Sequence, residues 1–376
     1  MKNIKLFNKI AACGLNRLGD DYNTKEELKS YEGILVRSAQ LIEEKFPSEL
    51  LAIARAGAGV NNIPVDRCTE EGICVFNTPG ANANGVKELA VLCLLLASRD
   101  VVGAIDWAKT LEGNADAAKL VEKGKSAFAG CEIKGKTLSI IGLGAIGGML
   151  ANSAIALGMD VIGYDPWLSV PAALKLDARV QITADLDVLF SKADYLSIHV
   201  PSTPDTKGMI NASAIAKMKD QVKILNLARA DLVNSADVVS ALEQGKVKVY
   251  VTDFPNADVI GKKGVIAIPH LGASTEEAED NCAIMAADQL KGFIENGNVV
   301  NSVNFPALSM ARCAAERLTV LYKDGTDLSA FTAKAVAAVS AQRKGIGYAI
   351  LDLADSADAL KNELEKLDGV IRVFKF

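Results

Sequence analysis

The sequence predicts an α/β protein built around a doubly wound parallel sheet. Three observations support this prediction. Short runs rich in Val, Ile and Leu alternate with helical segments through the middle of the chain, and the glycine-rich turn Gly142-Leu-Gly-Ala-Ile-Gly147 directly follows one of these runs. The first part of the chain repeats the strand–helix alternation more weakly. Continuous apolar strands joined by helices are typical of a parallel sheet that is covered on both faces.

Length and composition limit the classes of protein that the chain can represent. At 376 residues, it is too long for one ordinary core, so two or three domains are expected. Half of the residues are hydrophobic and 23% are charged, which excludes a mainly disordered chain. A net charge of −5 without a concentrated basic block gives a nucleic-acid partner no electrostatic support.

Neither a membrane nor a metal is predicted as a partner. The longest conspicuous apolar run, residues 89–97, is far shorter than the roughly 20 residues that span a bilayer, and the first residues carry no secretion signal. The protein is therefore expected to be cytoplasmic. The seven cysteines form no CxxC pair, and His199 and His270 are the two histidines of the chain. A zinc site is improbable with this set, and the cysteines are interpreted as buried free thiols.

The expected strands follow in chain order. In the first part they are residues 33–36, 51–54 and 73–77, and in the central region they are 137–141, 160–164, 195–200, 222–227, 247–252 and 265–268. Helices are expected between them, among others at 144–157 and 235–244. A long helix from about residue 276 to about 295 could carry the chain back to the first domain.

The tail from about residue 317 predicts a third, small module. Strands are expected at 318–322, 347–353 and 371–374, with helices at 328–340 and 356–367. This order resembles a split βαβ module in which one strand is weak or missing.

The glycine-rich turn is the strongest local sign of function. Gly142 would permit a tight turn, Gly144 would let a pyrophosphate approach the backbone, and Gly147 would allow close packing of helix on strand. The next strand ends at Asp165, which is 165 − 147 = 18 residues further on. An acid at this distance can bind ribose hydroxyls and repel a 2′-phosphate, so NAD is favoured over NADP. The alternative is an ordinary glycine-rich turn.

Several polar residues follow strands of the central region. His270 is a candidate for acid–base chemistry, and the alternative is a hydrogen-bonded core histidine. Arg229 is a candidate for binding a carboxylate, and the alternative is a surface salt bridge. Asp253 or Asp258 could orient His270. His199 is interpreted as shaping the nucleotide cleft without acid–base duty.

With these residues in view, the chain resembles the D-isomer-specific 2-hydroxyacid dehydrogenases. The resemblance runs across nearly the whole chain, in matched segments that follow one another in the same order. These segments are Ile-Leu-Val-Arg37-Ser, Ala-Arg55-Ala-Gly-Ala-Gly59-Val-Asn-Asn, Phe-Asn77-Thr-Pro-Gly-Ala-Asn82, the dinucleotide turn, His199-Val-Pro, the Arg229 segment and Pro-His270-Leu-Gly-Ala-Ser.

The resemblance implies a three-part architecture. A flavodoxin-like α/β substrate domain would comprise residues 1–97 and 281–304, with an NAD-binding Rossmann domain of residues 98–280 inserted in it. A ferredoxin-like, ACT-like module, with a regulatory or oligomer-forming role, would occupy residues 317–376. The long segment 100–130 resembles the family's intersubunit arm, which implies a homodimer or a higher homo-oligomer.

The resemblance also implies roles for individual residues. His270 would be the general base in hydroxyl oxidation, Arg229 would hold the substrate carboxylate, and Asp258 would stand in for the family's histidine-orienting glutamate, which is absent here. The residues implied in cofactor binding are Gly142, Gly144, Ala145, Ile146, Gly147, Asp165, His199, Val200, Pro201, Thr206, Leu227, Ala228, Asp253 and Gly272. Those implied in substrate binding are Arg37, Ser38, Arg55, Gly57, Ala58, Gly59 and Asn82.

Within the family, the resemblance implies NAD-dependent oxidation of 3-phospho-D-glycerate at C2 to 3-phosphohydroxypyruvate, the entry step to L-serine biosynthesis. Arg37 and Arg55 would then meet the substrate phosphate. One alternative is a reductase of another small 2-oxo acid, such as hydroxypyruvate or glyoxylate, and another is an NAD(H)-sensing interaction protein without turnover. The tail could bind an amino-acid effector such as serine, although its first loop lacks the Pro-Gly turn that the family often has. Asn234 is a further departure, because it occupies a position that is usually acidic in the family.

Overall fold

The computed structural model describes all 376 residues and divides them into two compact units. Unit 1 comprises Met1–Asn82 and Glu276–Phe376, and unit 2 comprises Ala83–Thr275. These boundaries differ from the expected ones at 97/98 and 280/281. The first difference arises because α3 (Ala83–Leu96) buries Ala90, Cys93 and Leu94 in the same core as the central sheet of unit 2. No helix combines the length and the apolar character that crossing a membrane requires.

Unit 1 contains a five-stranded parallel sheet in the order β2-β1-β3-β4-β5. The strands are β1 (Lys2–Phe7), β2 (Tyr22–Lys25), β3 (Gly33–Val36), β4 (Ala52–Arg55) and β5 (Cys74–Phe76). The helices are α1 (Ala12–Leu18), α2 (Val65–Glu70) and the long return helix α11 (Glu276–Asn296). A 2-1-3-4-5 order is the flavodoxin-like arrangement, so this part of the predicted fold class is confirmed.

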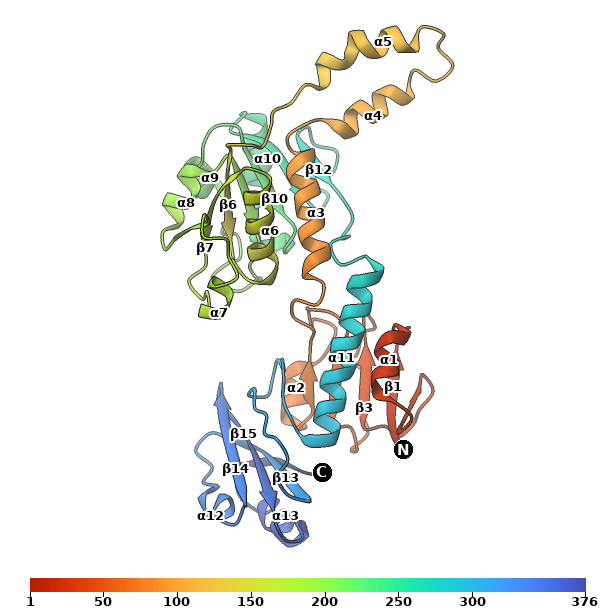
Figure 1. Cartoon of the computed structure of the whole chain (residues 1–376), viewed down its shortest axis with the longest axis vertical. Helices are drawn as coiled ribbons and strands as arrows, with labels where there is room; N and C mark the ends of the chain where they lie inside the picture. The colour runs from red at the N-terminus through yellow and green to blue at the C-terminus, as the bar shows by residue number, and fades with distance from the viewer. The chain divides into compact units, whose positions relative to one another are not determined.

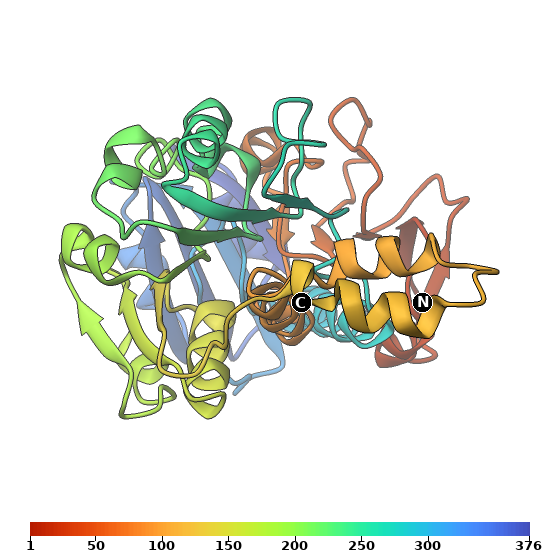
Figure 2. The ribbon, with the colours of Figure 1, turned by 90° about the horizontal axis from the view of Figure 1, so that it is seen from above.

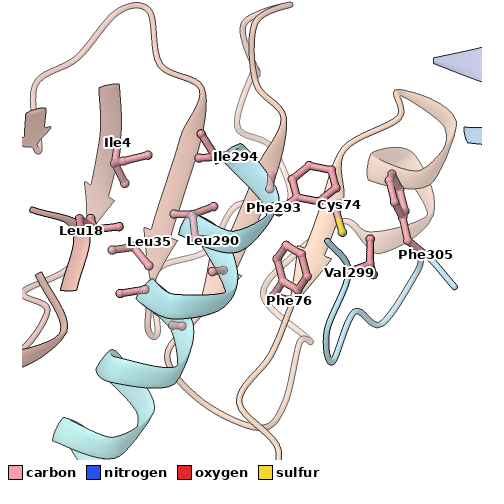
Figure 3. Close-up of a cluster of buried hydrophobic side chains, with 14 of the residues drawn as sticks. Ile4, Leu18, Leu35, Cys74, Phe76, Leu290, Phe293, Ile294, Val299 and Phe305 are labelled. Carbon is pink, nitrogen blue, oxygen red and sulfur yellow. The ribbon is translucent and has the colours of Figure 1, made fainter. Parts of the chain in front are cut away.

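The return helix is held to this sheet by apolar packing. Leu290, Phe293 and Ile294 of α11 lie in one buried cluster with Ile4 of β1 and Leu35 of β3, as Figure 3 shows. Full burial of each such side chain is worth about 1.5–3 kcal/mol. The return helix therefore holds the first strands together.

Unit 2 contains a seven-stranded parallel sheet in the order β12-β11-β10-β9-β6-β7-β8. The strands are β6 (Thr137–Ile141), β7 (Asp160–Tyr164), β8 (Gln181–Thr183), β9 (Tyr195–Ile198), β10 (Val222–Asn226), β11 (Val247–Thr252) and β12 (Val265–Ala267). The helices besides α3 are α6 (Ala145–Ala156), α7 (Val170–Ala173), α8 (Leu186–Lys192), α9 (Ala212–Ala216) and α10 (Ser235–Glu243), and η2 (Ala230–Leu232) is a short 3₁₀ turn. The order is that of the predicted Rossmann domain, in which ligands bind where the strand order reverses, here between β6 and β9.

A helical arm leaves unit 2 after α3. It consists of α4 (Val101–Lys109), α5 (Ala117–Gly124) and the 3₁₀ turn η1 (Lys125–Phe128). Its two limbs run side by side away from the sheet (Figures 1 and 2), and the rings of Trp107 and Phe128 pack with centroids 5.3 Å apart. The apolar side chains Val101, Val102 and Ile105 remain exposed on it.

The tail forms a four-stranded antiparallel sheet in the order β14-β15-β13-β16. Its elements are β13 (Glu316–Lys323), α12 (Ser329–Thr332), β14 (Ala337–Arg343), β15 (Ile346–Leu353), α13 (Asp358–Leu364) and β16 (Val370–Lys375). This is the ferredoxin-like βαββαβ order. The predicted helix over 328–340 is wrong beyond Thr332, and the strand thought weak or missing is present as β14. The alanines of this stretch favour a helix, but pairing with β15 overrides that intrinsic preference.

Candidate active site

The turn after β6 is shaped by its glycines. Gly142 has φ +91°, and a side chain there would place its Cβ 2.7 Å from the His199 carbonyl oxygen. A Cβ on Gly147 would lie 1.9 Å from the Gly142 oxygen, so α6 can approach β6 only with glycine at this position. A Cβ on Gly144, in contrast, would meet nothing within 4 Å. At Gly142 and Gly147 the protein therefore leaves no room for a side chain, whereas the space beside Gly144, where α6 begins, is open. A pyrophosphate could bind in this open space.

Asp165 connects this turn to the end of β7. Its Oδ2 accepts a hydrogen bond of 2.9 Å from the Leu143 amide, and its Oδ1 accepts one of 2.9 Å from the Trp167 amide. The carboxylate is thus fixed beside the glycine turn, and each oxygen keeps a lone pair for a further donor. This placement fits recognition of ribose hydroxyl groups.

The segment after β9 lies next to the turn at the point where the strand order reverses. The His199 ring shares a 2.8 Å hydrogen bond with Ser197 Oγ through Nε2, and its buried Nδ1 has no partner. Burial lowers the pKa of His199 to about 4, so the ring is neutral near pH 7. Further along, Thr206 Oγ1 donates to the Pro201 carbonyl at 2.7 Å and holds the loop in place.

His270 lies in unit 2 close to the segment that follows β10. Its ring packs on Phe254 with centroids 4.4 Å apart and an angle of 45° between the planes, and the Arg229 guanidinium lies 5.9 Å from the same Phe254 ring. Desolvation and the positive charge of Arg229 both lower the pKa of His270. His270 is therefore a neutral base at neutral pH, exposed to solvent at this edge of the sheet.

The Arg229 segment is held by Asn226, the last residue of β10. The Asn226 side chain donates to the Arg229 carbonyl at 2.8 Å and accepts from the Ala228 amide at 3.2 Å. The guanidinium of Arg229 is exposed and makes a 2.6 Å hydrogen bond to the Ala228 carbonyl. Its charge acts on the buried Asp253 carboxylate, and its exposed side chain can receive an anionic ligand.

Asp253 is the one deeply buried carboxylate near these residues. It is 2% exposed, and its Oδ1 has no hydrogen-bond partner. Burial raises its pKa to about 6, against the opposing effect of Arg229. A Cβ on Gly272 would lie 3.6 Å from Asp253 Oδ2, so the implied cofactor residues Asp253 and Gly272 are neighbours. A buried carboxylate oxygen without a hydrogen-bond partner, such as Asp253 Oδ1, could accept a hydrogen bond from a ligand donor such as an amide.

Asp258 is not joined to His270 in the structure. No hydrogen bond or ion pair links the two residues, and the exposed Asp258 carboxylate accepts a 3.4 Å hydrogen bond from Asn256. Its neighbour Val259 is buried in the core of unit 2, and this anchors the turn with Asp258 on the solvent side.

The implied substrate residues of unit 1 lie at the carboxyl edge of its sheet. Arg37 follows β3 and Arg55 ends β4, and the Arg55 side chain joins the two segments by a 2.8 Å hydrogen bond from its Nε to the Arg37 carbonyl. Arg55 Nη1 also donates to the Gly59 carbonyl and thereby folds the Gly57–Gly59 loop back over the strand end. Ser38 and Ala58 are exposed beside these arginines, and Asn82 is half-buried.

Two supporting residues were missed by the sequence reasoning. Phe254 packs on His270 and lies near Arg229, yet its sequence signal is only its place after Asp253. Asn226 had a recognisable signal, because an Asn side chain commonly accepts from the amide two residues on. The Phe254 contact depends on the fold bringing separate strand ends together, whereas the Asn226 contacts are local.

Comparison with known proteins gives consistent results. Residues 93–272 match the family model described as D-isomer specific 2-hydroxyacid dehydrogenase, NAD binding domain. A D-3-phosphoglycerate dehydrogenase of Synechocystis is 35% identical over 74% of this chain and 50% of its own. The NAD⁺-bound 3-phosphoglycerate dehydrogenase of Entamoeba histolytica matches with a TM-score of 0.63 and 25% identity, over 82% of this chain and 99% of that one. A glyoxylate reductase of Paecilomyes thermophila, at 24% identity and a TM-score of 0.67 over 80% of this chain and 98% of its own, shares the fold.

The chain spans about half the length of the curated relatives that it matches. The matched region includes the glycine turn, Asp165, Arg229 and His270.

Proposed function

Because the chain belongs to the D-isomer-specific 2-hydroxyacid dehydrogenases through its NAD-binding domain, we propose that it oxidises 3-phospho-D-glycerate to 3-phosphohydroxypyruvate. This is the first step of L-serine biosynthesis. The observation that carries the proposal is the arrangement of His270, Phe254 and Arg229 at one edge of the NAD-binding sheet. Relatives named D-3-phosphoglycerate dehydrogenase support the choice of substrate.

In this proposal His270 removes the proton from the C2 hydroxyl. The lowered pKa keeps its imidazole neutral, which is the form that can accept a proton. NAD supplies the acceptor for the hydride that leaves C2. Arg229 binds the substrate carboxylate and stabilises negative charge on the carbonyl oxygen as it forms. Phe254 packs against the His270 ring and helps to set its orientation.

Residues of unit 2 would hold the cofactor. The backbone amides of Gly144, Ala145, Ile146 and Gly147 at the start of α6 would receive the pyrophosphate, and Asp165 would bind the adenosine ribose. Asp253 would contact the nicotinamide end, where its unpartnered Oδ1 can accept a hydrogen bond. His199 to Pro201, Thr206, Leu227, Ala228 and Gly272 would line the remainder.

The substrate phosphate is proposed to meet Arg37 and Arg55 of unit 1. Ser38, Gly57, Ala58, Gly59 and Asn82 would complete the substrate side. Arg37 is already paired with Glu279 of α11, since its Nη2 lies 2.5 Å from Oε1. A dianionic phosphate competes well with a single exposed carboxylate for a guanidinium, so this pair can open on binding.

The assignment of Arg37 to the substrate phosphate is tested by comparing Arg37 with a second arginine that is also paired with an acid of α11. Arg37 and Arg17 each form an exposed ion pair with an acid of α11, Arg37 with Glu279 and Arg17 with Asp288. We expect Arg37→Gln to lower kcat/KM for 3-phosphohydroxypyruvate at least about tenfold, because a charge-assisted phosphate contact is worth about 1.5–3 kcal/mol. Activity on unphosphorylated hydroxypyruvate should change little, and Arg17→Gln should affect neither. An equal loss of kcat/KM for both substrates in Arg37→Gln would show that Arg37 does not bind the phosphate.

The remaining expectations concern the cell and the assembly. We propose that the protein works in the cytoplasm as a homodimer or higher oligomer, with the exposed Val101, Val102 and Ile105 of the arm covered by a second copy. The C-terminal sheet is proposed to accept an amino-acid effector such as serine. Sedimentation analysis tests the assembly, and a monomer would contradict it. The reaction rate and the sedimentation profile with and without serine test the effector, and no change in either would contradict it.

A further inference from the structure

A second cluster of reactive groups lies in unit 2 at the amino ends of the strands, opposite to the edge that carries His270. Tyr195 is the first residue of β9 and Lys223 the second of β10, while Cys131 precedes β6 and Ser98 follows α3. The Cys131 amide donates to the Ser98 carbonyl at 3.0 Å, so the cluster closes the base of the helical arm.

Four side chains meet in this cluster. Lys223 Nζ lies 3.2 Å from Cys131 Sγ and 3.0 Å from the Tyr195 hydroxyl, and it also sits 4.2 Å from the centre of the Tyr195 ring. The Tyr195 hydroxyl lies 2.7 Å from Ser98 Oγ and 3.6 Å from Cys131 Sγ. The proposed reaction uses none of these groups.

The lysine of the cluster needs a counter-charge. Lys223 is 6% exposed, and none of the ion pairs of the chain gives it a carboxylate partner. An unpaired buried ammonium is costly. Of the groups that Lys223 touches, Cys131 is the one that ionises most readily, because a thiol has a pKa about 1.5 below that of a phenol. A thiolate on Cys131 would therefore complete a buried ion pair.

The electrostatics of the cluster agree with this assignment. Burial raises the pKa of Cys131, but hydrogen bonds from Tyr195 and Lys223 and the charges of Lys223 and Lys248 outweigh it, so that the net shift is downward. Burial lowers the pKa of Lys223, and its contacts with Tyr195 and Cys131 reverse this to a net rise. Both partners are thus shifted towards their charged forms.

We propose that Cys131 is a reactive thiolate, held by Lys223, and that it is a modification site for small peroxides. Cys131 is half-buried and not fully enclosed, so a small oxidant can reach it. In the reaction, the sulfur attacks one oxygen of hydrogen peroxide, an S–O bond forms as the O–O bond breaks, and the departing hydroxide takes a proton to become water. Sulfur is oxidised to the sulfenic acid and the peroxide is reduced. The loss of the thiolate removes the partner of Lys223 at the base of the arm.

The intact protein contains its own control for this proposal. Cys313 is the one exposed cysteine of the chain, and its pKa is raised, chiefly by its contact with Asp352 and then by desolvation. Native protein would be treated with limiting iodoacetamide at several pH values, quenched, digested and read by mass spectrometry at each cysteine. If solvent exposure determines the rate of alkylation, Cys313 reacts first. If a thiolate stabilised by Lys223 determines it, Cys131 reacts first.

We expect Cys131 to be alkylated at least about fivefold faster than Cys313 at pH 7, with a midpoint in its pH–rate curve below about 8.5. Lys223→Met should slow Cys131 by about tenfold and leave Cys313 unchanged. Hydrogen peroxide followed by dimedone should label Cys131 in the native protein and label nothing at that site in Cys131→Ser. If Lys223→Met does not fold, the pH–rate curve of the unaltered protein decides alone. Slower reaction at Cys131 than at Cys313, or a midpoint at or above about 8.5, would overturn the proposal.

Discussion

At the scale of single residues, the site contains two titratable groups whose pKa values the protein shifts towards the neutral form. Burial raises the pKa of Asp253 to about 6, while desolvation and Arg229 lower that of His270. A neutral imidazole is what a general base requires, and groups with perturbed pKa values often mark functional sites. Both candidates were visible in the sequence because they follow apolar strands. Their environments were not visible, since these depend on Phe254 and Arg229 from other parts of the chain.

Asp253 gives a prediction about stability. Its folded pKa lies above its unfolded value of 3.8, so the free energy of unfolding falls as the pH rises through the interval from 3.8 to about 6. At about 1.4 kcal/mol per pH unit, the cost of the buried carboxylate at neutral pH is roughly 3 kcal/mol. In urea unfolding, Asp253→Asn should therefore be more stable than the unaltered protein by roughly 3 kcal/mol at pH 7.5 but by only about 1 kcal/mol at pH 4.5, because the folded carboxyl is protonated at the lower pH. The same gain at both pH values would show that ionisation is not the cause.

Asp258 gives a prediction about the pH dependence of the rate. As the proposed orienting residue, it would raise the His270 pKa, so Asp258→Asn should shift the acidic limb of the oxidation rate to lower pH and reduce kcat. In the structure, its carboxylate contacts Asn256 instead. The pH–rate profile of the variant decides between the two arrangements. An unchanged rate and profile would remove Asp258 from the site and leave Arg229 and burial to set the His270 pKa.

At the scale of elements, one glycine of the turn after β6 is needed for folding and another is proposed to serve cofactor binding. Gly147 is required by the protein, because a Cβ there would lie 1.9 Å from the Gly142 oxygen, whereas a Cβ on Gly144 would meet nothing within 4 Å. We expect Gly147→Ala to lower the free energy of unfolding by at least about 2 kcal/mol. Gly144→Ala should stay within about 0.5 kcal/mol and weaken NADH binding by roughly tenfold or more. Thermal melts and fluorescence titration measure the two effects, and matching losses in both variants would contradict this division.

The elements differ in how far their sequences predict them. β6, β7 and β11 were predicted with their observed limits, because buried parallel strands are continuous apolar runs. β1 and β2 were not predicted, since lysines interrupt both and only Ile4 and Tyr22 are buried along them. Asn234 departs from the family pattern, and the structure gives a local reason: its side chain accepts from the Asp237 amide and caps α10.

At the scale of the whole molecule, the C-terminal sheet shares the apolar core of the first sheet within unit 1. The buried cluster that holds Phe293 of α11 also contains Leu321 of β13, Tyr348 of β15 and Phe374 of β16. The Phe374 ring lies 5.6 Å from that of Phe293 at an angle of 78°, and Arg372 of β16 donates to the Leu50 carbonyl at 2.7 Å. Composition and periodicity predicted a third module, but they could not reveal this shared core, because its residues are far apart along the chain.

The shared core predicts that the module stabilises the first sheet as well as itself. Phe374→Ala should lower the free energy of unfolding by about 3–5 kcal/mol, the usual cost of emptying a buried phenylalanine site. Phe331→Ala is the matched control, because its ring packs only partly buried in the module's own core. Hydrogen exchange should report faster exchange in β3 and β4 for Phe374→Ala and not for Phe331→Ala. Unaltered exchange in both strands would mean that the module is independent.

The central claim is that the chain is a dehydrogenase specific for a phosphorylated 2-hydroxy acid. It is tested most directly by following NADH absorbance with 3-phosphohydroxypyruvate, hydroxypyruvate, glyoxylate and pyruvate in turn, since reduction is the favourable direction near neutral pH. We predict turnover of the phosphorylated ketone with the highest kcat/KM of the four, and loss of that turnover in His270→Asn. Turnover of the unphosphorylated acids alone would contradict the proposed substrate, and NADH binding without turnover of any would contradict the enzyme itself.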